Sequence, residues 1–119
     1  MNSKELEERL IKFAVDIILF AKTNEKSFAG NHLSGQMIRS GTSPALNYGE
    51  ARSAESVNDF IHKLQLVLKE LRETVINLKI IKQAKLNSNP QFLDQLITEN
   101  NELISIFVKS IETSKKKRK

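Results

Sequence analysis

The chain has 119 residues, of which 39% are hydrophobic and 28% charged, a balance typical of one folded domain and not of a disordered segment. It contains no cysteine, which excludes disulfides, thiolate zinc sites and cysteine nucleophiles. The formal net charge of +5 invites a nucleic-acid interpretation, but the basic residues are unevenly placed.

The last five residues are all basic: Lys115, Lys116, Lys117, Arg118 and Lys119. Without them the 19 basic residues fall to 14, which equals the number of acidic residues. We therefore divide the chain into a formally neutral domain over residues 1–114 and a basic tail over residues 115–119, which we expect to be disordered because like charges repel.

No segment of the sequence predicts membrane insertion or export. The longest wholly apolar run, Ile17–Ala21, is far shorter than the ~20 residues that a membrane-spanning helix needs. The N-terminus carries Glu5, Glu7 and Glu8 where an export signal has a basic segment followed by an apolar one. We expect a cytoplasmic protein without membrane association.

Helix-forming residues dominate the chain, and four glycines and two prolines are the only strong helix breakers. The first predicted helix covers residues 3–23, where Asn2 and Glu5 have the spacing of an N-terminal capping box. A polar loop follows over residues 23–31, and Asn31 is the expected N-cap of the next helix.

The second predicted helix covers residues 32–49 and has the least regular apolar pattern. Pro44 lacks an N–H group and its ring presses on the preceding turn. We therefore expect a kinked or locally widened helix near residues 40–44 and not a clean break. Gly49 is the expected C-terminal cap.

Two further helices complete the predicted fold. Residues 57–86 follow Ser56 as N-cap, and their apolar residues repeat every three or four positions. Residues 90–113 follow Asn89 as N-cap, with a proline at the first helical position. Four helices with short connections predict an all-α fold, an antiparallel up-down-up-down four-helix bundle.

The apolar faces of the first and third helices are broad. A helix that packs on a single core needs an apolar stripe of only ~100°. Soluble monomers rarely leave large apolar patches in contact with water. We therefore expect a homo-oligomer with cyclic symmetry.

Constellations for catalysis or metal binding are missing from the sequence. The two histidines, His32 and His62, lie far apart in the predicted hairpin, and no Glu-x-x-His pair occurs. We interpret both histidines as surface residues. We expect no enzymatic activity, no metal and no cofactor.

A polar network is predicted between the second and third helices. The helical spacing places four residues on one face of the second helix and a matching polar set on the third, namely Arg39, Ser43, Asn47 and Glu50 opposite Asp59, Lys63, Glu70 and Glu73. In an antiparallel hairpin Arg39 should pair with Glu70 or Glu73. Asn47 and Glu50 should approach Asp59 and Lys63. We interpret the network as structural, setting helix register, with a ligand or RNA site as the alternative.

The basic tail also has two interpretations. It could bind phosphates in a salt-dependent, sequence-independent way, or it could be a solvated end that keeps the protein soluble. The tail lacks aromatic residues for base stacking, so base-specific recognition is not expected.

The segments Arg39–Ala51 (RSGTSPALNYGEA), Asp59–Leu64 (DFIHKL) and Leu68–Thr74 (LKELRET) carry a family resemblance. Over residues 5–113 the chain resembles the bacterial four-helix-bundle family of proteins encoded in intervening sequences of 23S rRNA genes. That family is also similar to the accessory variability proteins of diversity-generating retroelements. Val75-Ile76-Asn77 replaces an aromatic pair that many members carry, and the basic tail is not part of the family pattern.

The resemblance implies an antiparallel four-helix bundle that assembles as a homopentamer with a central channel, and it implies no catalysis. For the retroelement relatives it implies binding to nucleic acid and to a reverse transcriptase. We therefore expect an oligomer that binds RNA or DNA, in particular structured RNA. The alternative is a scaffold that docks a protein partner such as a reverse transcriptase.

Overall fold

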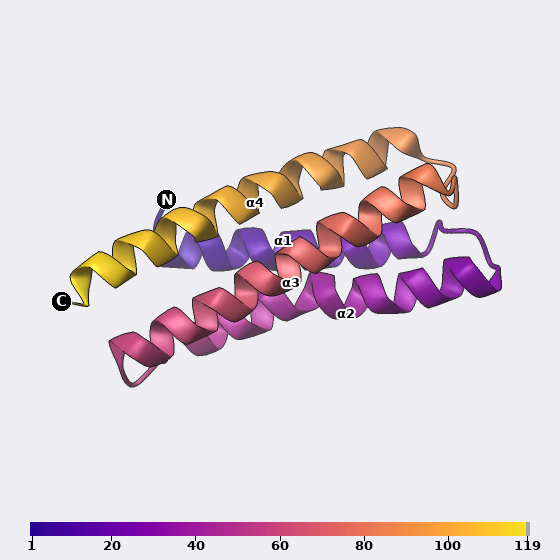
Figure 1. Ribbon diagram of the computed structural model, residues 1–119. Coiled ribbons are helices and arrows are strands. Elements are labelled where there is room, and N and C mark those ends of the chain that lie inside the picture. The colour runs from indigo at the N-terminus through magenta and orange to yellow at the C-terminus, as the bar shows by residue number, and fades with distance from the viewer. Residues whose placement is uncertain (119) are drawn as a thin grey trace.

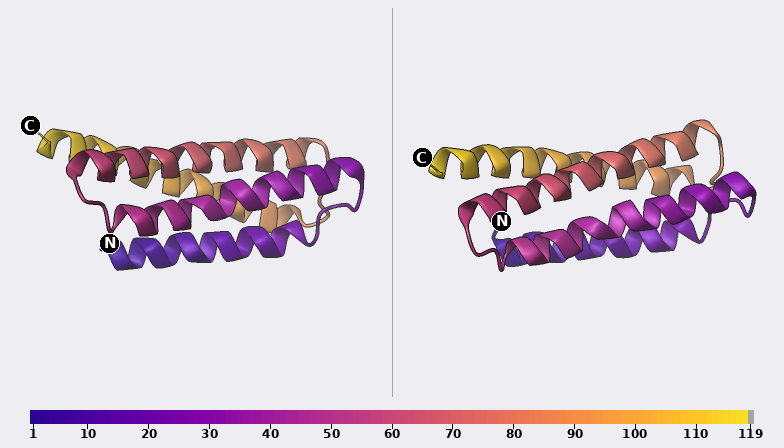
Figure 2. Two further views of the ribbon diagram at one scale, coloured as in Figure 1. Left: turned by 90° about the horizontal axis from the view of Figure 1, so that it is seen from below. Right: turned by 60° about the horizontal axis from the view of Figure 1, so that its bottom comes forward.

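Four α-helices joined by three short connections make up the computed structural model, which describes residues 1–118 (Figure 1). The helices are α1 (Ser3–Ala21), α2 (Phe28–Ala51), α3 (Val57–Gln83) and α4 (Pro90–Lys117). They run alternately up and down, each packs against its sequence neighbours, and α1 also packs against α4 (Figure 2). The result is the predicted antiparallel four-helix bundle, with overall extents of 49 × 21 × 20 Å.

Three of the predicted N-caps are confirmed. The Glu5 amide donates to Asn2 Oδ1 at 2.8 Å, and Glu5 returns a carboxylate oxygen to the Asn2 amide at 3.3 Å, which completes the capping box. Ser56 Oγ accepts from the Asp59 amide at 3.0 Å at the start of α3. Asn89 accepts from the amide of Phe92 at the start of α4. Each cap satisfies an amide that would otherwise lack a partner.

The predicted bounds of α2 were wrong at both ends. The helix begins at Phe28 because Ser27, and not Asn31, is its N-cap, with Ser27 Oγ accepting from the Gly30 amide at 3.1 Å. Gly30 lies in the first turn of α2. A Cβ at this position would collide with the carbonyl of Glu25, so the close approach of this carbonyl requires a glycine. The helix continues past Gly49 to Ala51.

Pro44 lies within α2 without breaking it, as predicted. The predicted local widening is absent, because residues 40–44 keep α-helical geometry. Gly41 lies one turn before the proline and faces α1, where a Cβ would lie 2.9 Å from Ile17 Cγ2. The missing side chain at Gly41 therefore sets how closely α1 and α2 approach each other.

The loops at one end of the bundle are linked to each other, and both flanking helices end earlier than predicted. α1 ends at Ala21 and α3 at Gln83, where Lys85 adopts a left-handed backbone conformation with φ of 58°. The Glu25 amide donates to the Leu86 carbonyl at 2.8 Å. This contact joins the two loops a few residues beyond the ends of α1 and α3, and sequence patterns do not show it.

The C-terminal helix is longer than predicted. α4 continues to Lys117, so the expectation that it ends near residue 113 and that a disordered tail begins at residue 115 was wrong for residues 115–117. No helix breaker follows residue 113, lysine is a good helix former, and basic residues in the last turn interact favourably with the helix dipole. Lys119 lies outside the described residues.

The core runs the length of the bundle and includes the large, fully buried side chains Phe13, Phe20, Phe107, Leu10, Ile17, Met37, Leu64, Leu71, Leu78, Ile81 and Leu103. All four helices contribute to it. None of the helices among residues 1–118 has the length and apolar character needed to cross a membrane.

Candidate nucleic-acid interface

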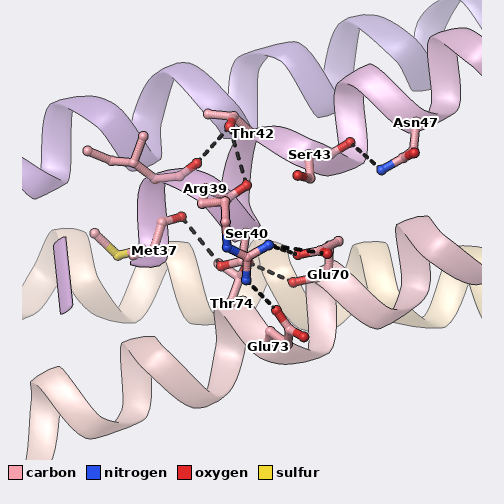
Figure 3. A network of polar contacts seen from close by, with 10 residues as sticks. Met37, Arg39, Ser40, Thr42, Ser43, Asn47, Glu70, Glu73 and Thr74 are labelled. Atoms are coloured by element: carbon pink, nitrogen blue, oxygen red, sulfur yellow. Dashed lines mark hydrogen bonds and ion pairs between the residues drawn. The ribbon is translucent and has the colours of Figure 1, made fainter. Parts of the chain in front are cut away.

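Arg39 joins α2 to α3 through two carboxylates (Figure 3). Its Nη1 lies 3.1 Å from Glu70 Oε2, and its Nη2 lies 2.8 Å from Glu73 Oε2, which confirms the predicted pairing. The hydrogen bond from Arg39 lowers the pKa of Glu73, and the same bond is the main reason that the pKa of Arg39 is raised. The two glutamates of α3 that face α2 are thus both engaged by one cation.

The second half of the predicted network is only partly formed. Lys63 Nζ lies 2.8 Å from Glu50 Oε1, as expected, and this bond raises the pKa of Lys63. No hydrogen bond joins Asn47 to Asp59 within residues 1–118; Asn47 Nδ2 instead donates to the Ser43 carbonyl one turn earlier in its own helix at 3.1 Å. An amide side chain on a helix can donate to a backbone carbonyl of its own helix, and helical spacing alone does not show which acceptor it takes.

A buried pair of hydroxyls lies beside Arg39 and was missed by the sequence analysis. Thr74 Oγ1 is 2.8 Å from Ser40 Oγ and 2.8 Å from the carbonyl oxygen of Glu70 (Figure 3). Both residues are almost fully buried. Ser40 belongs to the Arg39–Ala51 motif but lies outside the predicted polar set of Arg39, Ser43, Asn47 and Glu50. These small polar groups lie where α2 and α3 pack closely.

Two buried asparagines add further links between helices. Asn77 Nδ2 donates to the Leu33 carbonyl at 3.3 Å, and Asn100 Nδ2 donates to the Leu71 carbonyl at 2.9 Å. Their Oδ1 atoms are enclosed without a partner among the described residues. Together with the Arg39 pairs, these bonds join α2 to α3 and α3 to α4.

The basic end of α4 lies beside the start of α3. Lys115, Lys116 and Lys117 form the last turn of α4, and Arg118 Nη1 lies 3.3 Å from Asn58 Oδ1. These four side chains are exposed, and none forms an ion pair within the described part of the chain. The basic cluster, residues 115–118, is therefore held on a helix at a defined end of the bundle.

A second basic surface runs along α3. We define the α3 outer face as the exposed residues that repeat every three or four positions: His62, Gln65, Lys69, Arg72, Ile76, Lys79 and Gln83. This face contains three cations and no carboxylate, because Glu70 and Glu73 turn toward Arg39. In contrast, Asp94, Glu99 and Glu102 line a shallow groove along α4. Each of these carboxylates pairs with a cation, Asp94 with Lys82 and both glutamates with Arg9.

No group of three or more potential metal-ligating side chains comes together within residues 1–118. His32 and His62 are both exposed. The described residues thus define a helical bundle whose polar groups mainly join helices and which carries exposed cations in the basic cluster and on the α3 outer face.

The fold and this arrangement define the class: an all-α antiparallel four-helix bundle with exposed basic surfaces. The profile of the 23S rRNA-intervening sequence protein family matches residues 4–109, so the chain belongs to that family. A search of curated proteins gives no match.

One solved structure supports the same fold and family. It is a crystal structure at 1.70 Å of a protein with unknown function from the S23 ribosomal protein family of Bacteroides thetaiotaomicron VPI-5482. The two chains are 29% identical and superpose with a TM-score of 0.80, over 94% of this chain and 99% of that chain.

Proposed function

We propose that this protein is a non-enzymatic, cytoplasmic, oligomeric bundle that binds nucleic acid, in particular structured RNA, through the phosphate backbone. The observation that carries this proposal is the basic cluster of residues 115–118, which is exposed, forms no ion pair among the described residues, and occupies the last turn and C-cap of α4. Exposed cations that neutralise phosphates release counterions, which gives affinity without base recognition.

The α3 outer face extends the region available to a nucleic acid. Lys69, Arg72 and Lys79 lie on one side of a helix whose first turn is joined to Arg118. Phosphate contacts position a protein on nucleic acid, whereas base contacts supply specificity. This surface has cations but no Phe, Tyr or Trp side chain, so we expect recognition of backbone shape and charge.

The proposed oligomer rests on an apolar surface of α1. Ile11, Val15, Ile18 and Leu19 are between 38% and 49% exposed and share one side of the helix. An apolar stripe of this kind favours association with another chain. A ring of identical chains would bring several basic clusters together and raise the avidity for RNA. The number five comes only from the family resemblance.

The same apolar stripe supports an alternative function. A scaffold could use it to dock a different protein, such as a reverse transcriptase, instead of a further copy of this chain. Capture of one defined protein partner that survives nuclease treatment would favour the scaffold over the RNA-binding oligomer.

Filter binding of a structured RNA to the full chain tests the main proposal. We expect binding at low salt that weakens steeply as salt rises. A variant that lacks residues 115–119 should bind more weakly and with a smaller salt dependence. Absence of binding at low salt would overturn the proposal, and unchanged binding by the shortened chain would overturn the role of the basic cluster.

A further inference from the structure

A groove of about 740 Å³ lies at the end of the bundle where α1 and α3 begin and α2 and α4 end. We call it the end groove. Side chains that are far apart in the sequence line it, because Ser3, Tyr48, Val57 and Ser114 come from four different helices. The basic cluster reaches it through Lys117. A concave site built from all four helices is the kind of place where proteins bind small ligands.

Tyr48 is an unusual feature of this lining. It is only 5% exposed, and its ring packs edge-on against Phe107 with centroids 5.5 Å apart. Its hydroxyl makes no hydrogen bond to any of residues 1–118. The hydroxyl is not among the enclosed unpaired atoms, so it opens into the end groove. The ring is thus held in the core while the hydroxyl reaches the groove without a partner among residues 1–118, which makes this hydroxyl a candidate to bind a ligand.

The hydroxyl of Tyr48 is suited to donate a hydrogen bond. Burial raises its pKa above the ordinary value of 10.0, so it stays protonated at neutral pH. Ser56 Oγ also lines the groove and accepts from the Asp59 amide, which leaves its own hydrogen free to donate. Ser3 and Ser114 add two further hydroxyls.

Two cations complete the polar lining. Arg52 pairs with Glu7 through Nη1 at 3.1 Å, and its remaining N–H groups stay available. Lys117 has no ion pair among the described residues. The start of α3 adds the positive end of a helix dipole. Glu55 is the one carboxylate of the lining, and the apolar wall includes Val57 and Phe60.

We propose that the end groove binds a phosphate monoester, such as the 5′-phosphate end of an RNA chain. A monoester has three terminal oxygens and up to two charges, and it can accept from several hydroxyls and two cations at once, whereas a phosphodiester offers two oxygens and one charge. The apolar wall suits the carbon atoms of the attached sugar, and Glu55 can accept from a sugar hydroxyl. The RNA form of this inference rests on the proposed function, since it assigns the end of the same nucleic acid to a second, specific site.

The test compares two versions of one oligoribonucleotide, with a 5′-phosphate or a 5′-hydroxyl, by fluorescence anisotropy on the full chain. We expect the 5′-phosphorylated form to bind about tenfold more tightly, as expected for a charge-assisted hydrogen-bonded contact. Tyr48→Phe removes the hydroxyl but keeps the ring against Phe107, and should bring the ratio close to one. Ser105→Ala, an exposed hydroxyl of α4 outside the groove, should keep the wild-type ratio. Thermal unfolding verifies that each variant is folded.

A second arm separates a free phosphate from a chain end. Tyr48 is the sole tyrosine and the chain has no tryptophan, so intrinsic fluorescence reports directly on the groove. A saturable change on titration with inorganic phosphate, absent with sodium chloride of equal ionic strength, identifies free phosphate as a ligand. Its absence together with a preference for 5′-phosphorylated RNA assigns the site to the chain end.

The outcomes distinguish the two proposals. Equal binding of both RNA forms, with no fluorescence response to phosphate, overturns the end-groove site and leaves the proposed RNA binding intact. The end-groove site is also overturned if Tyr48→Phe keeps the wild-type ratio of affinities for the 5′-phosphorylated and 5′-hydroxyl RNA. If neither RNA binds but phosphate gives a saturable response, the proposed function fails while the phosphate site stands.

Discussion

Ile17 of α1 packs directly against Gly41 of α2, where even a methyl group on the glycine would lie 2.9 Å from Ile17 Cγ2. The chain therefore needs glycine here for close approach and not for backbone flexibility. Gly35 of the same helix has no neighbour within 4 Å of an added Cβ. The two glycines form a matched pair for testing this contact.

Gly41→Ala should destabilise the bundle by about 1–2 kcal/mol, because the overpacking cost exceeds the gain in helix propensity. Gly35→Ala should instead stabilise it by roughly 0.5–1 kcal/mol, since only the propensity changes. Urea unfolding followed by circular dichroism measures both. Equal effects of the two substitutions would show that α1 and α2 are not in close contact at Gly41.

Thr74→Val should destabilise the fold by about 1 kcal/mol, because it removes the buried hydroxyl that lies 2.8 Å from Ser40 Oγ. Ser40→Ala should have a smaller effect in the Thr74→Val background than in the wild type, since the partner hydroxyl is already gone. A double-mutant cycle of unfolding free energies measures the coupling. Strict additivity would contradict an interaction between the two hydroxyls.

The Arg39–Glu73 pair should contribute to the loss of stability in acid. Arg39 lowers the pKa of Glu73 below its ordinary value of 4.5, so the stabilisation is present above about pH 4.5 and is lost as the pH falls through the lowered pKa of the folded state. Arg39→Gln should therefore lose less stability between neutral and acidic pH than the wild type does. Urea midpoints at a series of pH values measure this difference. Lys12→Gln, which breaks an ion pair within α1, controls for the loss of one surface cation.

Replacing Lys115, Lys116 and Lys117 by glutamine should reduce the dependence of RNA affinity on salt. Each lost phosphate contact lowers the slope of log affinity against log salt by about 0.7–0.9. The matched control replaces Lys22, Lys26 and Lys85, which belong to the α1–α2 and α3–α4 connections at the end of the bundle where α4 begins. Equal slopes for the two triple variants would show that affinity depends on net charge and not on the basic cluster.

Val15→Lys should disrupt self-association without unfolding the chain, because Val15 is 47% exposed within the apolar stripe of α1. Light scattering should give a smaller particle while the helical signal is retained. Glu8→Lys changes an exposed polar position of the same helix and should leave the particle size unchanged. A wild-type protein that is already monomeric would contradict the proposed oligomer.

Several features of the fold followed from local patterns. Asn2, Ser56 and Asn89 were predicted as N-caps because a cap needs only a side-chain acceptor and an amide three residues later. The pairing of Arg39 with Glu70 and Glu73 followed from helical spacing and hairpin geometry, which place these residues at the same height. The register between two regular helices can thus be predicted from the sequence when a short turn joins them.

Other features depended on contacts between distant segments. The start of α2 was predicted wrongly from the sequence, because the requirement for glycine at position 30 depends on a carbonyl of the preceding loop. The buried hydroxyls of Ser40 and Thr74 meet across α2 and α3 although they are 34 positions apart in the sequence. Such choices between similar local alternatives are made by tertiary contacts, which sequence spacing does not contain.

The sequence by itself determined the class of fold, the family and the concentration of charge at the C-terminus, because periodicity, capping residues and composition are local properties. Only the tertiary structure decided where those charges lie and what surrounds them. It placed Arg118 against Asn58 at the start of α3, brought the buried hydroxyls of Ser40 and Thr74 together, and put Tyr48 and Lys117 in the lining of one groove. The physical reason is that a binding surface is formed by residues that meet only when the helices pack.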